Sequence, residues 1–276
     1  MNAITAPGGV AQRKRVTLVQ FSGDGHDPSG DLDAMVERVR EHRASDLVVF
    51  PEFALRRNAD PSEALRRLTR EGPAVVFGEI RERAGRLVNL ATLADARGAG
   101  SYAKTHVHWT ESFLPGSDFP VFESPLGPTG MLICYDAAFP EVARSLALGG
   151  AKAILNVSAI PDHFHLRHVH RRLVACSTYN QVYTFFVNRT GRGYLGGSAV
   201  VDPEGEVVAV ADDRQESLTV DVDMSRVDAW REAEPTFAYR RPEVYGALAA
   251  PPSVSLVPTG VGTAEEARVD VAARLP

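Results

Sequence analysis

The chain has 276 residues, of which 44% are hydrophobic and 24% are charged, and its formal net charge is -5. This composition excludes a disordered or fibrous chain, and the acidic balance argues against a nucleic-acid partner. Two cysteines, Cys134 and Cys176, are too few for the disulfide framework of a small secreted domain. No apolar run approaches the ~20 residues that cross a bilayer, and the start lacks a signal-peptide pattern. We therefore expect a cytoplasmic protein with no membrane partner.

The first part of the chain alternates strand and helix patterns. A strand is predicted at residues 16–21 and a helix at 31–42, where apolar side chains recur at helical spacing. Residues 47–50 are apolar at every position, which indicates a strand covered on both faces. The pair Asp60-Pro61 then predicts a helix start, with aspartate as the N-cap and proline at the first helical position.

The later part of the chain is richer in short strands separated by turns. Helices are predicted from Pro140 to a glycine pair at 149–150, and along residues 166–176. Apolar runs bounded by turn residues predict further strands at 74–78, 87–94, 131–134, 153–157, 182–188, 198–202, 206–210 and 218–222. Early strand–helix alternation followed by hairpins is typical of a layered α/β fold with mixed sheets.

Length and composition also predict the domain organisation. A single α/β domain can exceed 200 residues, so we assign residues 14–246 to one domain. Residues 1–13 are small and polar and predict a flexible N-terminal arm. Residues 247–276 are rich in Ala, Pro and Val without a clear period, and predict a C-terminal tail that is either loose or packed on a partner subunit.

Cys134 is the first candidate for chemistry. It ends an apolar strand and precedes the proline-started helix, so its side chain is presented at a strand-to-helix turn. Backbone N–H groups at such a turn lack ladder partners and can hold an oxyanion beside a nucleophile. The alternative is a buried structural cysteine, which is the commoner fate of a lone Cys.

Three charged residues can serve this nucleophile. Glu52 lies at the C-terminal mouth of a buried strand, and desolvation against its phenylalanine neighbours should raise its pKa toward that of a general base. Lys104 stands in an otherwise uncharged stretch, and its ammonium would favour the thiolate of a nearby cysteine or hold an oxyanion. Glu111, seven residues later, could pair with Lys104 and fix its position. Chance placement in ordinary loops is the alternative for each.

Three motifs surround these residues in the order Glu, Lys, Cys. They are Val49-Phe50-Pro51-Glu52-Phe53, Tyr102-Ala103-Lys104-Thr105-His106 and Gly130-Met131-Leu132-Ile133-Cys134-Tyr135-Asp136. With these motifs the chain resembles the nitrilase superfamily of carbon–nitrogen hydrolases over about residues 16–222. The resemblance implies an αββα sandwich that pairs across helices into a homodimer or higher homo-oligomer. It also implies no metal and no organic cofactor.

The resemblance further implies a role for each matched residue. Glu52 would take the proton of Cys134 and later activate water, and Cys134 would form a thioester intermediate. Lys104 and the backbone N–H of Tyr135 would hold the oxyanion. Glu111 would orient the site as the second glutamate of the superfamily.

Substrate contacts are expected on the surrounding loops, at Tyr135, Phe53, Trp109, Ala138, Ser158, Asp162 and His163. Ala138 stands where superfamily members often have Arg, so we expect the pocket to lack a charged wall there. The stretch 176–179, before Asn180, also departs from the superfamily pattern, which affects the expected assembly more than catalysis. Four histidines at residues 163–170 suggest a metal site, but no thiolate or carboxylate set completes one. We expect this segment to line the pocket mouth or an oligomer contact.

The sequence thus predicts cysteine-dependent hydrolysis of a small amide or N-carbamoyl compound, releasing ammonia or amine. The sequence Cys134-Tyr135-Asp136 resembles the amidase branch of the superfamily. Nitrile hydrolysis and acyl transfer to an amine are the alternatives within the enzyme class. A non-catalytic binding scaffold is a third class, but a scaffold has no need of Glu52 and Lys104 together with the cysteine.

Overall fold

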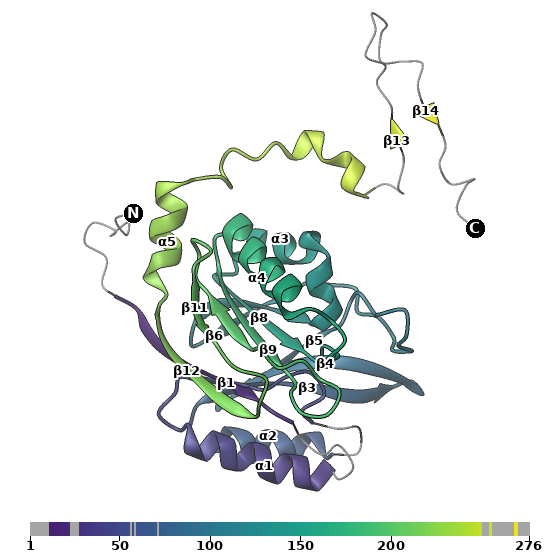
Figure 1. Cartoon of the computed structure of the whole chain (residues 1–276), viewed down its shortest axis with the longest axis vertical. Helices are drawn as coiled ribbons and strands as arrows, with labels where there is room; N and C mark the ends of the chain where they lie inside the picture. The colour runs from purple at the N-terminus through teal and green to yellow at the C-terminus, as the bar shows by residue number, and fades with distance from the viewer. Residues whose placement is uncertain are drawn as a thin grey trace, which may run out of the picture. The chain divides into compact units, whose positions relative to one another are not determined.

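The computed structural model describes residues 11–22, 28–55, 57, 59–70, 72–249, 254–255 and 268–269 (Figure 1). The chain divides into two compact units, Met1–Glu234 and Pro235–Pro276. Residues 1–10 of the predicted arm lie outside the described part. The first unit ends at Glu234, earlier than the boundary predicted at residue 246.

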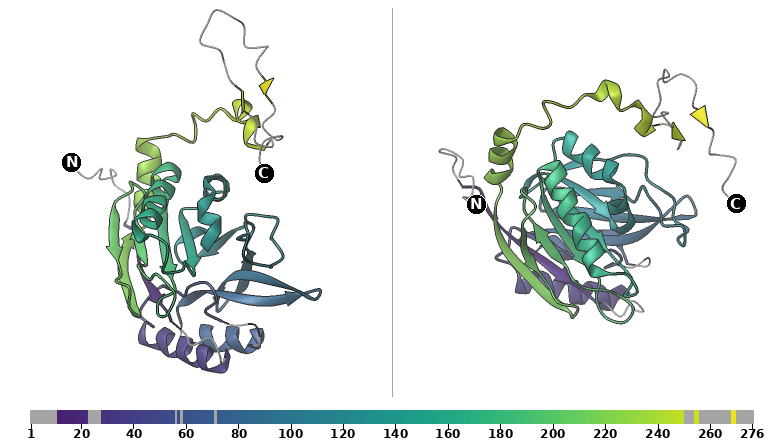
Figure 2. Two further views of the ribbon diagram at one scale, coloured as in Figure 1. Left: turned by 45° about the vertical axis from the view of Figure 1, so that its right-hand side comes forward. Right: turned by 45° about the horizontal axis from the view of Figure 1, so that its top comes forward.

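The first sheet of this unit has the strand order β12-β1-β2-β3-β4-β5. Strands β1, β2 and β3 are parallel, β4 and β5 continue by antiparallel pairing, and β12 pairs antiparallel with β1. Helices α1 and α2 cover its outer face (Figures 1 and 2). The bounds are β1 (Arg13–Gln20), α1 (Pro28–Glu41), β2 (Leu47–Val49), α2 (Pro61–Thr69), β3 (Ala74–Arg83), β4 (Arg86–Asp95), β5 (Gly98–Ala103) and β12 (Glu216–Asp223).

The second sheet has the order β11-β10-β9-β8-β7-β6. Strands β7, β8 and β9 are parallel, and the strands at either end pair antiparallel. Helices α3 and α4 lie on its outer face (Figure 2). The bounds are β6 (Val121–Ser124), β7 (Gly127–Ile133), α3 (Pro140–Leu148), β8 (Ala153–Ser158), α4 (Leu166–Asn180), β9 (Tyr183–Asn188), β10 (Ala199–Val201) and β11 (Val207–Val210).

An apolar layer lies between the two sheets. Their inner faces contribute Val49, Val76, Leu155 and Phe185 to one cluster of buried side chains. Another cluster fills the space between the first sheet and its helices, and a further one lies between the second sheet and α4. Each fully buried side chain of this size contributes about 1.5–3 kcal/mol. The layers therefore run helix, sheet, sheet, helix, which confirms the αββα sandwich expected from the sequence.

Local sequence signals explain many of the element ends. The Asp60 carboxylate accepts the backbone N–H groups of Ser62 and Glu63 at 2.8 and 3.4 Å, so it caps α2 as predicted. The sequence does not predict β5, β6 or the helix α5 (Ser225–Ala233). Strand β5 reads Gly-Ala-Gly-Ser-Tyr-Ala, a composition with little strand preference, and it forms because β4 pairs with it along its whole length.

The second unit, Pro235–Pro276, has little regular structure among its described residues. It contains short 3-10 helices at Pro242–Val244 and Gly246–Ala249 and a pair of two-residue strands, β13 (Val254–Ser255) and β14 (Arg268–Val269). Most of the tail predicted at 247–276 lies outside the described residues. Over the described parts of both units, no helix is long and apolar enough to cross a membrane.

Candidate active site

The three motif residues follow the ends of three strands. Glu52 comes after β2, Lys104 directly after β5, and Cys134 directly after β7. Strands β2 and β5 run in the same direction in the first sheet, and β7 belongs to the sheet packed against it. The carboxyl ends of these strands meet at one edge of the sandwich, which is where α/β sheets place their ligands.

Lys104 connects two carboxylates at this edge. Its Nζ lies 3.0 Å from Glu52 Oε1, and 3.0 and 2.9 Å from the two carboxylate oxygens of Glu111. The Lys104 and Glu52 side chains are each 1% exposed. Burial by itself would lower the pKa of Lys104, but the negative charges around it outweigh that effect and raise the pKa above its usual value. Lys104 therefore offers a permanent, fixed positive charge.

Glu52 is held between this ammonium and a strand residue. Asn89 on β4 donates from Nδ2 to Glu52 Oε1 at 2.7 Å. Burial raises the pKa of Glu52; Lys104 opposes the rise, and the charge of Glu111 adds to it. One ammonium shared by two carboxylates cannot offset both, so the pKa rises in the direction expected from the sequence.

The backbone that carries Glu52 lies directly against β3. A side chain at Gly78 would collide with the backbone of Pro51 and Glu52. The Gly78 N–H donates to the Pro51 carbonyl at 3.1 Å. Glycine at this position therefore lets the turn after β2 sit close enough to β3 for Glu52 to reach Asn89 and Lys104.

Cys134 begins a 3-10 turn at Cys134–Ala138 that links β7 to α3. Its φ is 47°, a left-handed conformation that costs a non-glycine residue about 1–3 kcal/mol. The Glu52 carboxylate and the Ala159 N–H act on this thiol in opposite directions, since the carboxylate raises its pKa and the N–H lowers it. Burial and then the charge of Glu52 raise the pKa of Cys134, while Lys104 only partly opposes them. Lys104 thus favours the thiolate as expected from the sequence, but burial and Glu52 outweigh it, so the thiol keeps its proton in the resting site.

Two further residues tie the site together, and the sequence predicted no role for either of them. Asn89 orients Glu52 as described above. Arg189 follows β9, is buried, and donates from its guanidinium to the carbonyl oxygens of Phe53 at 2.7 Å and Ser22 at 2.5 Å. It thereby connects the second sheet to the loop after Glu52. The sequence signal that could have identified Arg189 is a charged residue placed directly after an apolar strand, β9, whose positions are all buried.

Aromatic rings flank the site on two sides. Tyr135, next to Cys134, makes edge contacts with Phe139 at 5.2 Å and with Trp109 at 5.7 Å between ring centroids. Phe53 and Phe113 form a second ring pair at 5.9 Å. Trp109 is 77% exposed, so it stands at the rim rather than inside a closed wall. Tyr135, Phe53 and Trp109, all expected substrate contacts, therefore belong to two ring clusters, and Tyr135 and Phe53 directly follow Cys134 and Glu52 in the chain.

The remaining expected contacts lie at different depths. Ser158 is fully buried and donates from its hydroxyl to Asn156 Oδ1 at 3.0 Å, so its side chain supports the end of β8. Ala138 is partly buried in the turn after Cys134. Asp162 and His163 are exposed, and both belong to the loop that connects β8 to α4.

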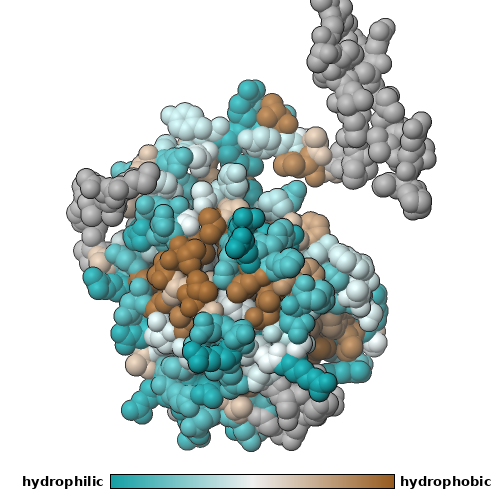
Figure 3. Space-filling view, in the orientation of Figure 1, coloured by the Kyte–Doolittle hydropathy of each residue, from teal (hydrophilic) through white to brown (hydrophobic). Residues whose placement is uncertain are grey.

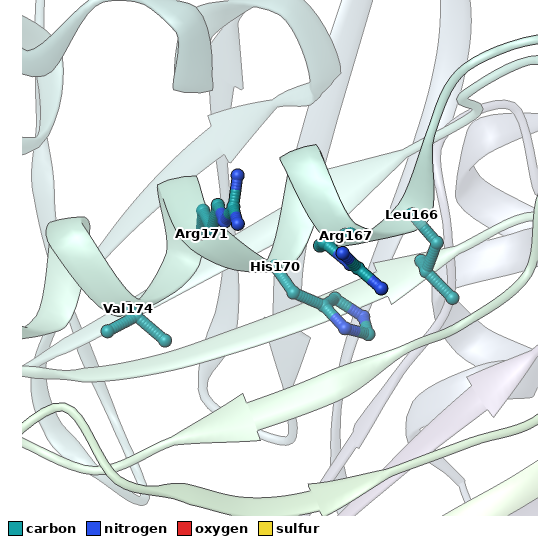
Figure 4. A pocket seen from close by; sticks show the side chains of 5 residues that line it. All are labelled: Leu166, Arg167, His170, Arg171 and Val174. Carbon is teal, nitrogen blue, oxygen red and sulfur yellow. The ribbon is translucent and has the colours of Figure 1, made fainter.

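The histidine segment provides no metal centre in the described part of the chain, where no group of three or more His, Cys, Asp or Glu side chains could hold an ion. His170 instead contacts the carbonyl oxygen of Gly197 at 2.8 Å through Nε2. A surface pocket on α4 is lined by Leu166, Arg167, His170, Arg171 and Val174 (Figure 4). None of the catalytic candidates lines this pocket, so it is separate from the site.

Fold and site together define a two-sheet α/β protein with a partly buried cysteine and a buried glutamate and lysine. Residues 15–232 match the family model described as "Carbon-nitrogen hydrolase". The chain belongs to this family, within the nitrilase superfamily, and the recognition from the three motifs is confirmed.

Proteins similar in sequence to this chain include amidases. An (R)-stereoselective amidase from Pseudomonas sp. is 30% identical over 242 residues, which cover 79% of this chain and 88% of that protein. An omega-amidase from Saccharomyces cerevisiae is 27% identical over 284 residues, which cover 86% of this chain and 96% of that protein.

Solved structures share the fold. Saccharomyces cerevisiae Nit3, a nitrilase-superfamily member, has a TM-score of 0.72 at 25% identity and covers 84% of this chain and 97% of its own. A mutant amidase from Nesterenkonia sp. AN1, with an acetamide moiety added covalently at its active-site cysteine, has a TM-score of 0.70 at 24% identity, covering 86% and 99%. At 24% identity, the similarity to the Nesterenkonia amidase shows a shared fold alone.

Proposed function

We propose that this protein hydrolyses the C–N bond of a small amide or N-carbamoyl compound through a thioester on Cys134. The observation that carries the proposal is the contact of the buried Lys104 with Glu52 and Glu111, together with the effect of Glu52 and Lys104 on the pKa of the Cys134 thiol. The amidase names among the relatives support the same chemistry. A binding scaffold would bury these charges without using them.

The acylation step uses all three groups. Glu52 takes the Cys134 proton while Sγ attacks the carbonyl carbon, and the carbonyl oxygen becomes an oxyanion. The Lys104 ammonium and the Tyr135 N–H stabilise that oxyanion. When it collapses, the C–N bond breaks and the nitrogen takes the proton from Glu52. Ammonia or amine leaves, and the acyl group remains on sulfur as a thioester.

The deacylation step repeats this sequence with water. Glu52 takes a proton from a water molecule, whose oxygen attacks the thioester carbon, and Lys104 again stabilises the oxyanion. The C–S bond then breaks, the sulfur regains the proton from Glu52, and the carboxylic acid leaves. A carboxylate whose pKa is raised toward neutrality is suited to accept and return protons in both steps.

The aromatic side chains next to the site support an acyl group with an apolar part. Tyr135 contacts Trp109 and Phe53 contacts Phe113, and rings of this kind bind apolar ligand surface. We therefore propose that Tyr135, Phe53 and Trp109 contact the acyl chain. Ala138, Asp162 and His163 would contact the remainder of the substrate. Ser158 would support the site indirectly, by stabilising the end of β8 through its hydrogen bond to Asn156.

The direct test is intact-protein mass spectrometry after incubation with amides, N-carbamoyl compounds and nitriles, together with measurement of released ammonia. Wild-type protein should gain the mass of the acyl group from an amide, and Cys176→Ala should gain it equally, whereas Cys134→Ala should gain none. Adducts and ammonia from nitriles but never from amides would replace the proposal with nitrile hydrolysis. Hydroxylamine as an acceptor would reveal acyl transfer as hydroxamate.

We also propose that the chain forms a homodimer or a higher homo-oligomer through its helical face. Figure 3 shows apolar side chains gathered over the face that carries α4 and β11, and Val207, Val208 and Val210 of β11 are exposed there. Such patches commonly mark association sites. Sedimentation velocity should give a dimer or larger species, and Val208→Glu should reduce its size; a monomer at all concentrations would contradict the proposal.

A further inference from the structure

Asp136 lies two residues after Cys134, and its carboxylate is fully buried. Oδ2 accepts the Ile133 N–H at 3.0 Å and the Tyr102 hydroxyl at 2.8 Å. Oδ1 accepts the His106 N–H at 2.8 Å and the Thr105 hydroxyl at 3.1 Å. The His106 ring nitrogen Nδ1 also lies 3.3 Å from Oδ1. Two backbone N–H groups, two hydroxyls and one ring nitrogen therefore converge on one carboxylate that carries no part of the proposed reaction.

These five partners come from the two segments that carry the reacting groups. Ile133 directly precedes Cys134, so its N–H belongs to the turn that holds the sulfur. Tyr102, Thr105 and His106 surround Lys104 at the end of β5. The segments belong to different sheets, so Asp136 joins the nucleophile of one sheet to the cation of the other.

The turn at Cys134 needs such support. Its left-handed φ of 47° is costly for a residue with a side chain, and it persists only where the surroundings impose it. The hydrogen bond from Ile133 N–H to Asp136 closes this turn across the strained residue.

We propose that Asp136 is a positioning residue that fixes Cys134 and Lys104 relative to one another. The kinetic part of this inference rests on the proposed function. Asp136 touches neither substrate nor sulfur in this role. It holds the strained turn on one side and the lysine segment on the other, so that the oxyanion forms within reach of Lys104.

The substitution Asp136→Asn provides a sharp test because each carboxylate oxygen of Asp136 accepts a hydrogen bond from one backbone N–H, and the amide replaces one of these oxygens with an NH2 donor. The hydroxyls of Tyr102 and Thr105 can rotate and accept a hydrogen bond from the new NH2 group. The N–H groups of Ile133 and His106 cannot. Whichever way the amide is turned, one backbone N–H faces another donor, and either the cysteine turn or the lysine segment is released.

Asp202 provides a matched control. It is also buried and accepts two backbone N–H groups, those of Glu204 and Glu206, each at 3.0 Å, in the turn between β10 and β11. Asp202→Asn should therefore lower the melting temperature without changing catalysis. Tyr102→Phe removes one hydroxyl donor from Asp136 and keeps the buried ring, so its effect should lie between wild type and Asp136→Asn.

The experiment measures kcat and KM per folded site, the melting temperature, and the iodoacetamide alkylation rates of Cys134 and Cys176 by peptide mass spectrometry. For Asp136→Asn we expect kcat to fall about a hundredfold with KM nearly unchanged, which is the effect of misplacing reacting groups by about 1 Å. Alkylation of Cys134 should slow severalfold, while that of Cys176 stays unchanged.

Wild-type kcat and wild-type Cys134 alkylation in folded Asp136→Asn would overturn the inference, as would a kcat loss equal to that of Asp202→Asn. The alkylation rates do not depend on any substrate. If wild-type protein turned over no amide, the proposed function would fail, and the ratio of Cys134 to Cys176 alkylation would still decide whether Asp136 positions the sulfur.

Discussion

Cys134 and Cys176 both lie where burial raises the pKa of a thiol, yet their neighbours differ. Cys176 lies in the regular helix α4, where the Thr184 hydroxyl donates to its sulfur at 3.5 Å. Cys134 lies in a strained turn, where the charges of Glu52 and Lys104 act on its pKa in opposite directions. Burial alone therefore does not make a nucleophile; an adjacent base and a fixed positive charge do.

The largest expected effect comes from removing each sulfur in turn. Cys134→Ala should lower kcat for amide hydrolysis on the order of 10⁴-fold or more, because no other group can carry the acyl chain. Cys176→Ala should leave kcat unchanged. Steady-state rates and circular dichroism of both variants check this. Equal losses in the two variants would show that the contrast between the cysteines is one of folding only.

The next effect comes from the base. Glu52→Gln should lower kcat about 10²–10⁴-fold, since general base catalysis is worth that much. Glu79→Gln is the control, because Glu79 is another buried glutamate, on β3, that accepts from the Thr92 hydroxyl away from the cysteine. Glu79→Gln should keep wild-type kcat.

The pH profile sharpens the same comparison. Turnover requires ionised Glu52, and the pKa of Glu52 is raised above the ordinary 4.5. Wild-type kcat/KM should therefore fall as the pH drops through a value above 4.5, and Glu79→Gln should show the same acidic limb. An acidic limb at an ordinary glutamate value would argue against Glu52 as the base.

A smaller loss is expected from the cation. Lys104→Met should lower kcat about 10²–10³-fold, the range for one oxyanion donor. Lys152→Met removes a lysine that pairs with Asp228 at the surface and should have no effect on kcat. Melting curves are needed beside the rates, since Glu52 and Glu111 lose their buried partner in Lys104→Met. A folded Lys104→Met variant with normal kcat would exclude Lys104 from the oxyanion site.

The smallest effect is a difference in reactivity between the two thiols. We expect iodoacetamide to alkylate Cys134 faster than Cys176, because Glu52 can take the proton of Cys134 during attack. Among the described residues, the groups that act on the Cys176 thiol are Thr184, Asn180 and Arg144, none of which is a carboxylate. Glu52→Gln should remove most of this difference and leave the Cys176 rate as it was. Equal alkylation of both cysteines in wild-type protein would contradict the activation of Cys134.

Sequence reasoning reached the site where the signal was local. Glu52 follows an apolar strand that ends at Pro51, and Cys134 follows β7 before a helix that begins at proline. Strand β5 was not predicted, because its sequence Gly-Ala-Gly-Ser-Tyr-Ala has little intrinsic strand propensity and is stabilised by pairing with β4. The contacts of Asn89 with Glu52 and of Arg189 with Phe53 join residues 37 and 136 positions apart, beyond any local pattern.

The sequence by itself determined which groups are available: one nucleophile, one ammonium and two carboxylates. Cys134, Lys104 and Glu52 each stand in a motif that places them after a strand, and Glu111 lies in the loop after β5. Only the tertiary structure decided their protonation. Packing the two sheets removes water from Cys134 and Glu52 and brings Glu111 to the same ammonium, so the thiol keeps its proton instead of ionising against Lys104. A pKa depends on desolvation and on every nearby charge, and those neighbours are assembled only when both sheets pack together.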